Sequence, residues 1–244
     1  MTAKNALTAK IEPPDSFWEA PEHIETGYSS FDQYYKKNYL RYLPADKTAR
    51  VLVVSCGPGY FVNTLTTRGY SDVLGIDSYL EKVTYAKTKN LNCITADAVP
   101  FLEQNPNQFD VIFYEQEINH LTKDEIVMFL RLCRNTLRKN GTLIIHSLNG
   151  ANPITGAEAL AQNFDHYTTF TEYSLRQVLR HSGFEEIQVI PLNLYVFYKN
   201  PVNYILILLD TFYTLFFRLS FMLYGKSNRI FTKKIGAISR KRSS

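Results

Sequence analysis

The first residues that could do chemistry are two glycines directly after a short apolar run. Arg50–Ser55 is rich in β-branched residues, and Gly57 and Gly59 follow it. Glycine has no Cβ, so the backbone can turn sharply there and approach a ligand closely. In a doubly wound sheet, nucleotide-like ligands bind at the first turn from strand to helix. The spacing therefore predicts a turn that binds a ligand. The alternative is that the glycines only allow a tight turn between strand and helix.

Acidic residues close the next strand-like runs. Asp77 comes about twenty residues after the glycines, where a carboxylate can accept hydrogen bonds from two ribose hydroxyls. Asp97 closes the third run and is placed to accept from an exocyclic amine, and Glu115 closes the fourth. A single acid at a strand end is often a solvated loop residue or a helix N-cap. Two acids and a glycine turn in this order favour a ligand site.

Short apolar runs alternate with helical patterns from Arg50 onward, which predicts right-handed βαβ units and a parallel sheet with helices on both faces. The helix Leu121–Arg138 is expected to end at Lys139-Asn140-Gly141, because basic residues and glycine are typical of a helix C-terminus. The expected strands are Arg50–Ser55, Asp72–Asp77, Asn92–Ala96, Phe109–Glu115, Thr142–Leu148 and Glu185–Leu192, and the other helices are Phe61–Arg68, Tyr79–Lys89 and Tyr173–His181.

The fold class is α/β, with a doubly wound and mostly parallel sheet. Tyr28–Leu43 is rich in tyrosine and lysine with a helical period, and we interpret it as a cap helix. Four segments are expected: residues 1–49 as an N-terminal arm and cap helix, 50–192 as the core, 193–230 as an apolar helical insertion, and 231–244 as a final strand with a basic tail.

These motifs resemble class I S-adenosylmethionine-dependent methyltransferases over roughly Ala49–Leu192, with a last and seventh strand near Lys234–Arg240. FDVIFYEQEINHL is similar to the motif that follows strand four in that family, and RNTLRKNGTLIIH to its signature before strand five. The resemblance implies S-adenosylmethionine as cofactor. The residues that it implies for cofactor binding are Ser55, Gly57, Gly59, Asp77, Asp97, Ala98 and Glu115.

Two positions depart from the family pattern. The family usually has an acid in the middle of strand one and a first glycine two residues later, where this chain has Val53 and Ser55. The missing acid normally helps to orient the methionine end of the cofactor. We expect either weaker cofactor binding or compensation by the tyrosines of the cap helix, Tyr28, Tyr34, Tyr35 and Tyr39. An aromatic face packed on the sheet explains these tyrosines equally well.

Methyl transfer to a hydroxyl needs a positioned acceptor and a base that removes its proton. His120 follows strand four, on the side to which the methyl donor should point, and histidine as a residue type exchanges protons near neutral pH. We weigh a base at His120 evenly against a cap of the next helix. His166 is the second catalytic candidate, with Tyr167 beside it. His146 is expected in the core, and Asn149 and Asn152 either meet the acceptor or form loop contacts.

No metal is expected. Metal-assisted members of the family carry two glutamates and a histidine in this motif, and alignment on His120 puts Gln116 and Asn119 at the acidic positions. Amides bind Mg²⁺ less well than carboxylates do. Glu115 and Glu117 are present but out of register.

Tyr204–Tyr224 is apolar and long enough to span a bilayer. On a helical wheel, Asp210, Thr214 and Arg218 fall on one side, and leucines and phenylalanines fill the opposite arc. A charged stripe in lipid is costly, so an interfacial helix in the membrane plane fits better than a lone spanning helix. The alternative is a helix buried against the domain or in a homodimer.

The overall composition is typical of a folded protein. Charged residues are 20% of the chain and the net charge is +4, but residues 225–244 hold seven basic groups and no acid. Residues 1–224 are mildly acidic, so no nucleic-acid partner is expected. The basic tail suits anionic headgroups. Three cysteines, an odd number, indicate buried reduced thiols in a cytoplasmic protein, and the first residues contain no secretory signal.

We expect an enzyme that transfers a methyl group. The resemblance extends to methyltransferases of bacterial surface-polysaccharide biosynthesis, which implies O-methylation of a sugar hydroxyl on a lipid- or nucleotide-linked glycan. The protein would then be peripheral on the inner face of the cell membrane. The alternatives are O-methylation of a lipid or quinone, and a scaffold with a decayed site that binds a partner at the membrane.

Overall fold

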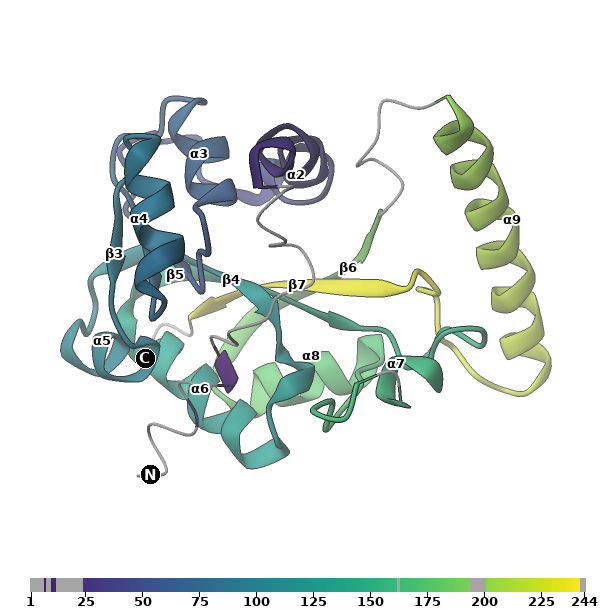
Figure 1. Ribbon diagram of the computed structural model, residues 1–244. Coiled ribbons are helices and arrows are strands. Elements are labelled where there is room, and N and C mark those ends of the chain that lie inside the picture. Colours follow the sequence, from purple (N-terminus) through teal and green to yellow (C-terminus); the bar gives the residue numbers. More distant parts are fainter. Residues whose placement is uncertain (1–6, 8–9, 12–23, 162, 194–200, 242–244) are drawn as a thin grey trace.

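The computed structural model describes residues 7, 10, 11, 24–161, 163–193 and 201–241. This part of the chain forms a seven-stranded sheet in the order β3-β2-β1-β4-β5-β7-β6 (Figure 1). The strands are β1 Val51–Val54, β2 Val73–Asp77, β3 Cys93–Thr95, β4 Phe109–Glu117, β5 Leu137–Leu148, β6 Phe184–Leu192 and β7 Lys234–Lys241.

The predicted α/β fold with a mostly parallel sheet is confirmed. β1 pairs in parallel with β2 and β4, and β4 pairs in parallel with β5. β7 runs antiparallel between β5 and β6. Its first residue, Lys234, therefore lies beside Leu148 and Leu192, the last residues of its two neighbours. The carboxyl ends of the parallel strands and the start of β7 meet at one edge of the sheet.

Helices cover both faces of the sheet (Figure 1). Side chains of α2, α3 and α4 pack on one face in one apolar cluster, and side chains of α5, α6 and α8 pack on the other. The α-helices are α2 Ile24–Asn38, α3 Tyr60–Thr66, α4 Leu80–Thr88, α5 Ala98–Gln104, α6 Lys123–Thr136, α7 Glu158–Ala161, α8 Glu172–His181 and α9 Val202–Leu223, with 3₁₀ turns at η2 Leu40–Tyr42 and η3 Ile118–His120.

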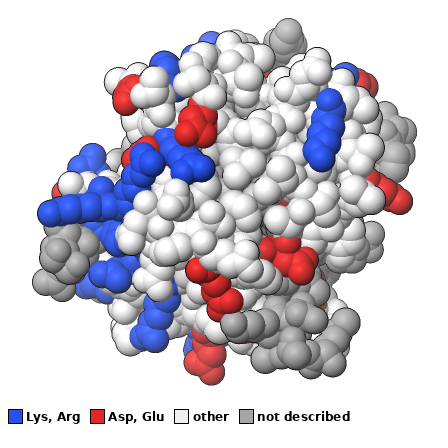
Figure 2. All heavy atoms as spheres, turned by 90° about the vertical axis from the view of Figure 1, so that its left-hand side faces the viewer, with Lys and Arg blue, Asp and Glu red and all other residues white. Residues whose placement is uncertain are grey.

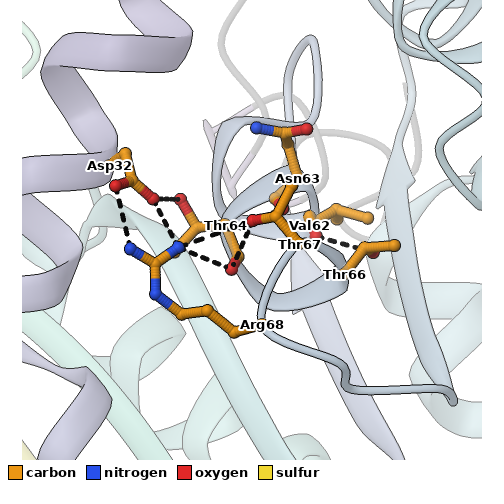
Figure 3. Close-up of polar contacts among 7 residues, drawn as sticks. All are labelled: Asp32, Val62, Asn63, Thr64, Thr66, Thr67 and Arg68. Carbon is orange, nitrogen blue, oxygen red and sulfur yellow. Dashed lines mark hydrogen bonds and ion pairs between the residues drawn. The ribbon is translucent and has the colours of Figure 1, made fainter.

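The cap helix α2 is tied to the helix that follows the glycine turn (Figure 3). Asp32 of α2 accepts two hydrogen bonds from the guanidinium of Arg68 and one from the hydroxyl of Thr64. These contacts hold the pKa of Asp32 below its ordinary value, because Arg68 favours the charged carboxylate. A guanidinium–carboxylate pair with two hydrogen bonds fixes the relative orientation of the two segments that carry it, so α2 is held against α3.

The predicted end of the long helix was wrong. α6 ends at Thr136, and β5 begins at Leu137, because Leu137 has an extended backbone and pairs with Phe109. Of the three residues expected to end the helix, Asn140 has a left-handed backbone (φ 62°), and all three lie within β5. The short helices α5 and α7 were not predicted, since neither shows an amphipathic period over its few residues.

α9 stands at the edge of the molecule beyond β6 and β7 (Figure 1). By length and composition it could cross a membrane, and none of it is buried inside the protein. Its half-buried side chains recur at intervals of three and four residues and face the domain: Asn203, Leu206, Ile207, Asp210, Thr214, Phe217, Ser220 and Phe221. The exposed arc on the other side is mostly apolar. Of the polar stripe predicted from the wheel, Asp210 and Thr214 point inward, whereas Arg218 is exposed.

The face shown in Figure 2 carries lysine and arginine side chains toward one side, with acidic side chains interspersed and a broad uncharged area between them. Charges of both signs therefore share this face.

Candidate functional site

The glycine turn joins β1 to α3 with a left-handed backbone at three positions. Ser55 has φ 59°, Gly57 φ 52° and Gly59 φ 84°. A Cβ at Gly59 would lie 2.8 Å from Leu91 Cδ1, so this position needs glycine for space as well as for conformation. Ser55 takes the left-handed conformation at the place where the resembled family has its first glycine, so the turn forms although its Cβ is strained there.

Asp77 lies directly under this turn at the end of β2. The backbone N–H of Gly57 donates to Asp77 Oδ2 over 2.9 Å, and the N–H of Tyr79 donates to Oδ1 over 2.9 Å. Asp77 is only 1% exposed, and burial raises the pKa of its carboxyl despite these bonds. An ionised carboxylate has about four acceptor positions, so two stay available for a ligand. Its predicted contact with a ribose remains a prediction, and its structural role is to hold the turn.

Asp97 lies beside Asp77 at the same sheet edge. β3 pairs with β2 so that Thr95 is opposite Asp77, and the N–H of Ala96 donates to the carbonyl oxygen of Asp77 over 3.0 Å. Asp97 is exposed and Ala98 is fully buried, so the carboxylate points outward from a packed helix start. The ends of β1, β2 and β3 thus bring the glycine turn and both predicted acids together.

The tyrosines of α2 pack on the sheet. Tyr34, Tyr35 and Tyr39 are buried among side chains of α3, β1 and β4. Two tyrosines also reach predicted cofactor residues. The hydroxyl of Tyr28 donates to the carbonyl of Pro58 inside the glycine turn over 2.6 Å, and the hydroxyl of Tyr35 donates to Glu115 Oε1. Burial raises the pKa of Tyr35 well above its ordinary value, so it stays protonated and keeps this bond.

His120 forms a carboxylate–imidazole pair that the sequence did not reveal. Its Nδ1 lies 2.8 Å from Asp165 Oδ2. An ionised carboxylate only accepts, so Nδ1 is the donor in this bond and Nε2 points away from the carboxylate. This is the arrangement in which an imidazole can take a proton from a substrate, with the carboxylate holding the ring in the correct tautomer. Asp165 comes from the connection between β5 and α8, a segment without any periodic pattern.

His166 packs edge-on against His120, with ring centroids 4.6 Å apart. Its Nδ1 donates to the carbonyl of Ala159 over 2.7 Å, and its Nε2 is 3.3 Å from Asn163 Nδ2. A carbonyl only accepts, so Nδ1 is the donor in the bond to Ala159. Both nitrogens are therefore engaged within the loop, and this geometry gives His166 an orienting role.

Asn119 connects the two segments that carry the pair. Its Oδ1 accepts from Ser147 Oγ and from the N–H of Leu148, each over 3.1 Å. Its backbone carbonyl accepts from the N–H of Tyr167 over 2.9 Å. Asn119 is fully buried. It therefore fixes the end of β4 against both the end of β5 and the loop that holds Asp165.

His120, Asp165 and His166 form the group of potential metal ligands found among the described residues, with ligand atoms within 4.8 Å of one another. Each histidine uses Nδ1 in a hydrogen bond to an oxygen. Such a bond is usual for a histidine that binds a metal through Nε2, so these bonds do not decide whether a metal binds. The sequence expectation that no metal is required stays a prediction.

A buried ion pair lies next to this site. Glu117 at the end of β4 pairs with Lys234 at the start of β7, and their side chains are 14% and 11% exposed. Burial by itself would raise the pKa of Glu117, but Lys234 and His146 outweigh it and lower that pKa. His146 lies opposite Glu117 in β5 and is buried, as expected. Burial lowers its pKa to about 4, so it is neutral at pH 7.

Asn149 and Asn152 hold the chain rather than open toward an acceptor. Asn149 Nδ2 donates to the carbonyls of Ile230 and Thr232, and Asn152 Nδ2 donates to that of Phe231. These bonds join the end of β5 to the segment that leads into β7. Tyr167 is half exposed, and Lys10 Nζ lies 4.5 Å from its ring centroid.

Comparison with known proteins agrees with this geometry. Residues 51–141 match the family described as a methyltransferase domain. The chain is 28% identical over 136 residues to N-terminal Xaa-Pro-Lys N-methyltransferase 1 of Ailuropoda melanoleuca, a match that covers 50% of this chain and 58% of that protein. The chain thus spans little more than half the length of this curated relative.

Solved structures show the same fold. An S-adenosylmethionine-dependent methyltransferase from Archaeoglobus fulgidus superimposes with a TM-score of 0.61 at 16% identity, covering 86% of this chain and 94% of its own. Phosphoethanolamine N-methyltransferase 2 of Haemonchus contortus, solved with S-adenosyl-L-methionine, gives 0.54 at 15% identity, covering 93% and 59%. Residues 51–141 are therefore similar to a methyltransferase domain, and the chain has the fold of these S-adenosylmethionine-dependent methyltransferases.

Proposed function

We propose that this protein transfers a methyl group from S-adenosylmethionine to an acceptor held at the carboxyl end of β4. The residues present fit the cofactor: Gly57 and Gly59 give the left-handed turn that would hold its methionine part, and the exposed Asp97 beside buried Ala98 can accept from its adenine amine. When bound, the cofactor supplies an electrophilic methyl group on a sulfonium. Ser55, Asp77 and Glu115 complete the proposed set, with Asp77 supporting the turn from below.

The observation that carries the proposal is the His120–Asp165 pair, because it lies at the sheet edge that also holds the glycine turn. His120 Nε2 takes the proton of the acceptor, and Asp165 holds the ring and stabilises the imidazolium that forms. Asn119 positions His120 from below. His166 limits rotation of the His120 ring by edge contact.

For the acceptor we propose a hydroxyl of a sugar on a lipid- or nucleotide-linked glycan, at the cytoplasmic face of the cell membrane. A hydroxyl needs a base such as His120 to become a nucleophile. The membrane setting is supported by the apolar outward arc of α9 and the basic residues that follow it. The alternatives are a lipid or quinone hydroxyl, and a scaffold that has lost catalysis.

An amine acceptor is the second candidate. The relatives named N-terminal Xaa-Pro-Lys N-methyltransferase match about half of this chain. An ammonium group must also lose a proton before it can accept a methyl group, and the same His120–Asp165 pair could remove it. A hydroxyl acceptor and an amine acceptor therefore both need a base at this site.

Calorimetry with S-adenosylmethionine tests the proposed class. We expect saturable binding, and we expect Asp97→Ala to weaken it, with Asp124→Ala on α6 as the matched surface control. The absence of binding at millimolar cofactor would reject every enzymatic reading and leave the scaffold.

Asp165→Asn tests the base. The amide keeps the shape of the carboxylate but allows the other tautomer of His120, so turnover should fall at least tenfold while cofactor affinity stays within twofold. Hydroxyl- and amine-containing extracts, each with labelled cofactor, give the turnover assay. Unchanged labelling in the variant would remove His120–Asp165 from the mechanism.

Vesicle flotation tests the membrane setting. The protein should float with vesicles that contain anionic lipid, and Leu208→Glu with Leu219→Glu on the outward arc of α9 should reduce recovery. Equal recovery of both forms would discard the membrane setting and leave the methyltransferase proposal unaffected.

A further inference from the structure

A cavity lies between α9 and the body of the domain, at the sheet edge that carries the proposed site. Its volume is about 420 Å³. The apolar lining comes from Leu206, Leu209, Tyr213 and Phe217 on α9, and from Leu192 and Phe231 opposite them. Pockets of this size and character bind small apolar ligands.

The cavity also has a polar part. Asp210 and Thr214 line it from α9, and Thr155 and Lys233 line it from the domain. Thr155 Oγ1 is buried and has no hydrogen-bond partner among the described residues. Burial raises the pKa of Asp210. An apolar pocket with a few polar groups on facing walls suits an amphiphile that has both an apolar chain and a polar head.

The cavity is joined to the proposed catalytic pair by the chain itself. Thr155 belongs to the same connection between β5 and α8 that carries Asp165 and His166. Lys233 immediately precedes Lys234, which pairs with Glu117 three residues before His120. Leu192 and Lys233, which line the cavity, lie at the same carboxyl edge of the sheet as the end of β4 that leads to His120. A head group at that end of the cavity would lie on the side of the sheet that carries the proposed pair.

The outer side of α9 indicates where such a ligand comes from. Seven large apolar side chains on the outward arc are 54–69% exposed: Ile205, Leu208, Phe212, Leu215, Phe216, Leu219 and Met222. That arc carries no charged residue. An apolar helix face of this size marks contact with a membrane or a partner. The cavity lies on the inner side of α9, where a flexible chain can enter but the rigid surface of a second copy cannot.

From this placement we infer that the cavity binds the apolar chain of one membrane lipid and presents its polar head as the methyl acceptor. This inference rests on the proposed methyltransferase function, and it assigns the acceptor to the amphiphiles. α9 then has two faces with different tasks, since its outward arc contacts the membrane and its inward arc contacts the chain of the bound lipid.

The test uses the full chain and a fluorescent single-chain amphiphile, dansyl-undecanoic acid, kept below its micelle concentration. We expect saturable binding of one probe per protein and competition by unlabelled farnesol. Thr214→Trp fills the inward side and should weaken binding at least tenfold. Leu215→Trp places the same ring on the outward arc as the matched control and should leave affinity within twofold.

Leu206→Trp is the second filling variant in case Thr214→Trp does not fold, which circular dichroism will show. Equal losses in Leu206→Trp and Leu215→Trp, or probe binding that does not saturate, would overturn the inference. So would a dimer in sedimentation velocity that dissociates on Leu215→Glu and binds no probe.

Calorimetry with S-adenosylmethionine on the same samples separates the two proposals. Cofactor binding without probe binding rejects the lipid cavity and keeps the methyltransferase. Probe binding without cofactor binding rejects the assignment of the lipid as an acceptor together with the methyltransferase.

Discussion

The ion pair between Glu117 and Lys234 gives the sharpest prediction about stability. It joins the end of β4 to the start of the antiparallel strand β7, and both side chains are nearly buried. We expect Glu117→Gln to destabilise the protein, because the charge of Lys234 would remain desolvated without its partner. Lys234→Met should destabilise it for the converse reason.

The magnitude follows from burial. Removing one partner of a fully buried pair costs about 3–5 kcal/mol. Exposures of 14% and 11% put this pair near the lower end, about 3 kcal/mol. For a domain of this length that corresponds to a fall in Tm of roughly 6–12 °C. The double variant Glu117→Gln, Lys234→Met leaves no buried charge and should recover most of the loss.

The pH dependence has a definite sign. The pKa of Glu117 is lower in the folded chain than in the unfolded chain. Its contribution is therefore present above the unfolded value near 4.3 and is lost as the pH falls through the folded pKa. The difference between wild type and Glu117→Gln should shrink below about pH 4.

Thermal and urea unfolding followed by circular dichroism, on the wild type, both single variants and the double variant, measures the coupling. Exposed Glu81→Gln on α4 serves as the control for loss of one surface acid. A single variant as stable as the wild type would refute the argument, and so would a double variant whose loss equals the sum of the single losses.

Three further outcomes are expected. His146 has a pKa of about 4 in the folded chain against an ordinary value of 6.5, so the unfolded chain binds a proton at higher pH than the folded chain does. The free energy of unfolding should therefore fall by about 3 kcal/mol from pH 7 to pH 4. His146→Asn should reduce this pH dependence in urea unfolding, and an unchanged dependence would exclude His146 as its source. Ser55→Gly should raise the free energy of unfolding by about 0.5–1 kcal/mol, because it removes a strained Cβ at φ 59°. Asn140→Gly at φ 62° should raise it less, since asparagine tolerates this conformation. Equal gains in the two variants would contradict the reasoning. Dialysis against EDTA should change neither cofactor affinity nor Tm, and a loss that Zn²⁺ restores would show that His120, Asp165 and His166 hold a metal.

Short-range pattern was enough to predict the order of the strands along the chain, the glycine turn and the two acids after it. These features depend on residues within a few positions of one another, or on strand ends that a parallel sheet must bring to one edge. The wheel of α9 likewise separated its polar side from its apolar side. The end of α6 was wrong because pairing of Leu137 with Phe109, a contact across the sheet, outweighed the local signal at Asn140 and Gly141.

Long-range packing decided the rest. Asp165 pairs with His120 across 45 residues, and Lys234 pairs with Glu117 across a larger gap, and neither spacing has a period that a sequence can show. Ser55 was expected to weaken cofactor binding, which stays a prediction. The structure shows that Ser55 has the left-handed backbone of the turn and that Asp77 accepts from Gly57 N–H below it. The sequence by itself determined which side chains α9 carries on each arc. Only the folded domain decided that Asp210 faces inward and that Leu208 and Leu219 face outward, because that choice depends on what the rest of the chain places beside the helix.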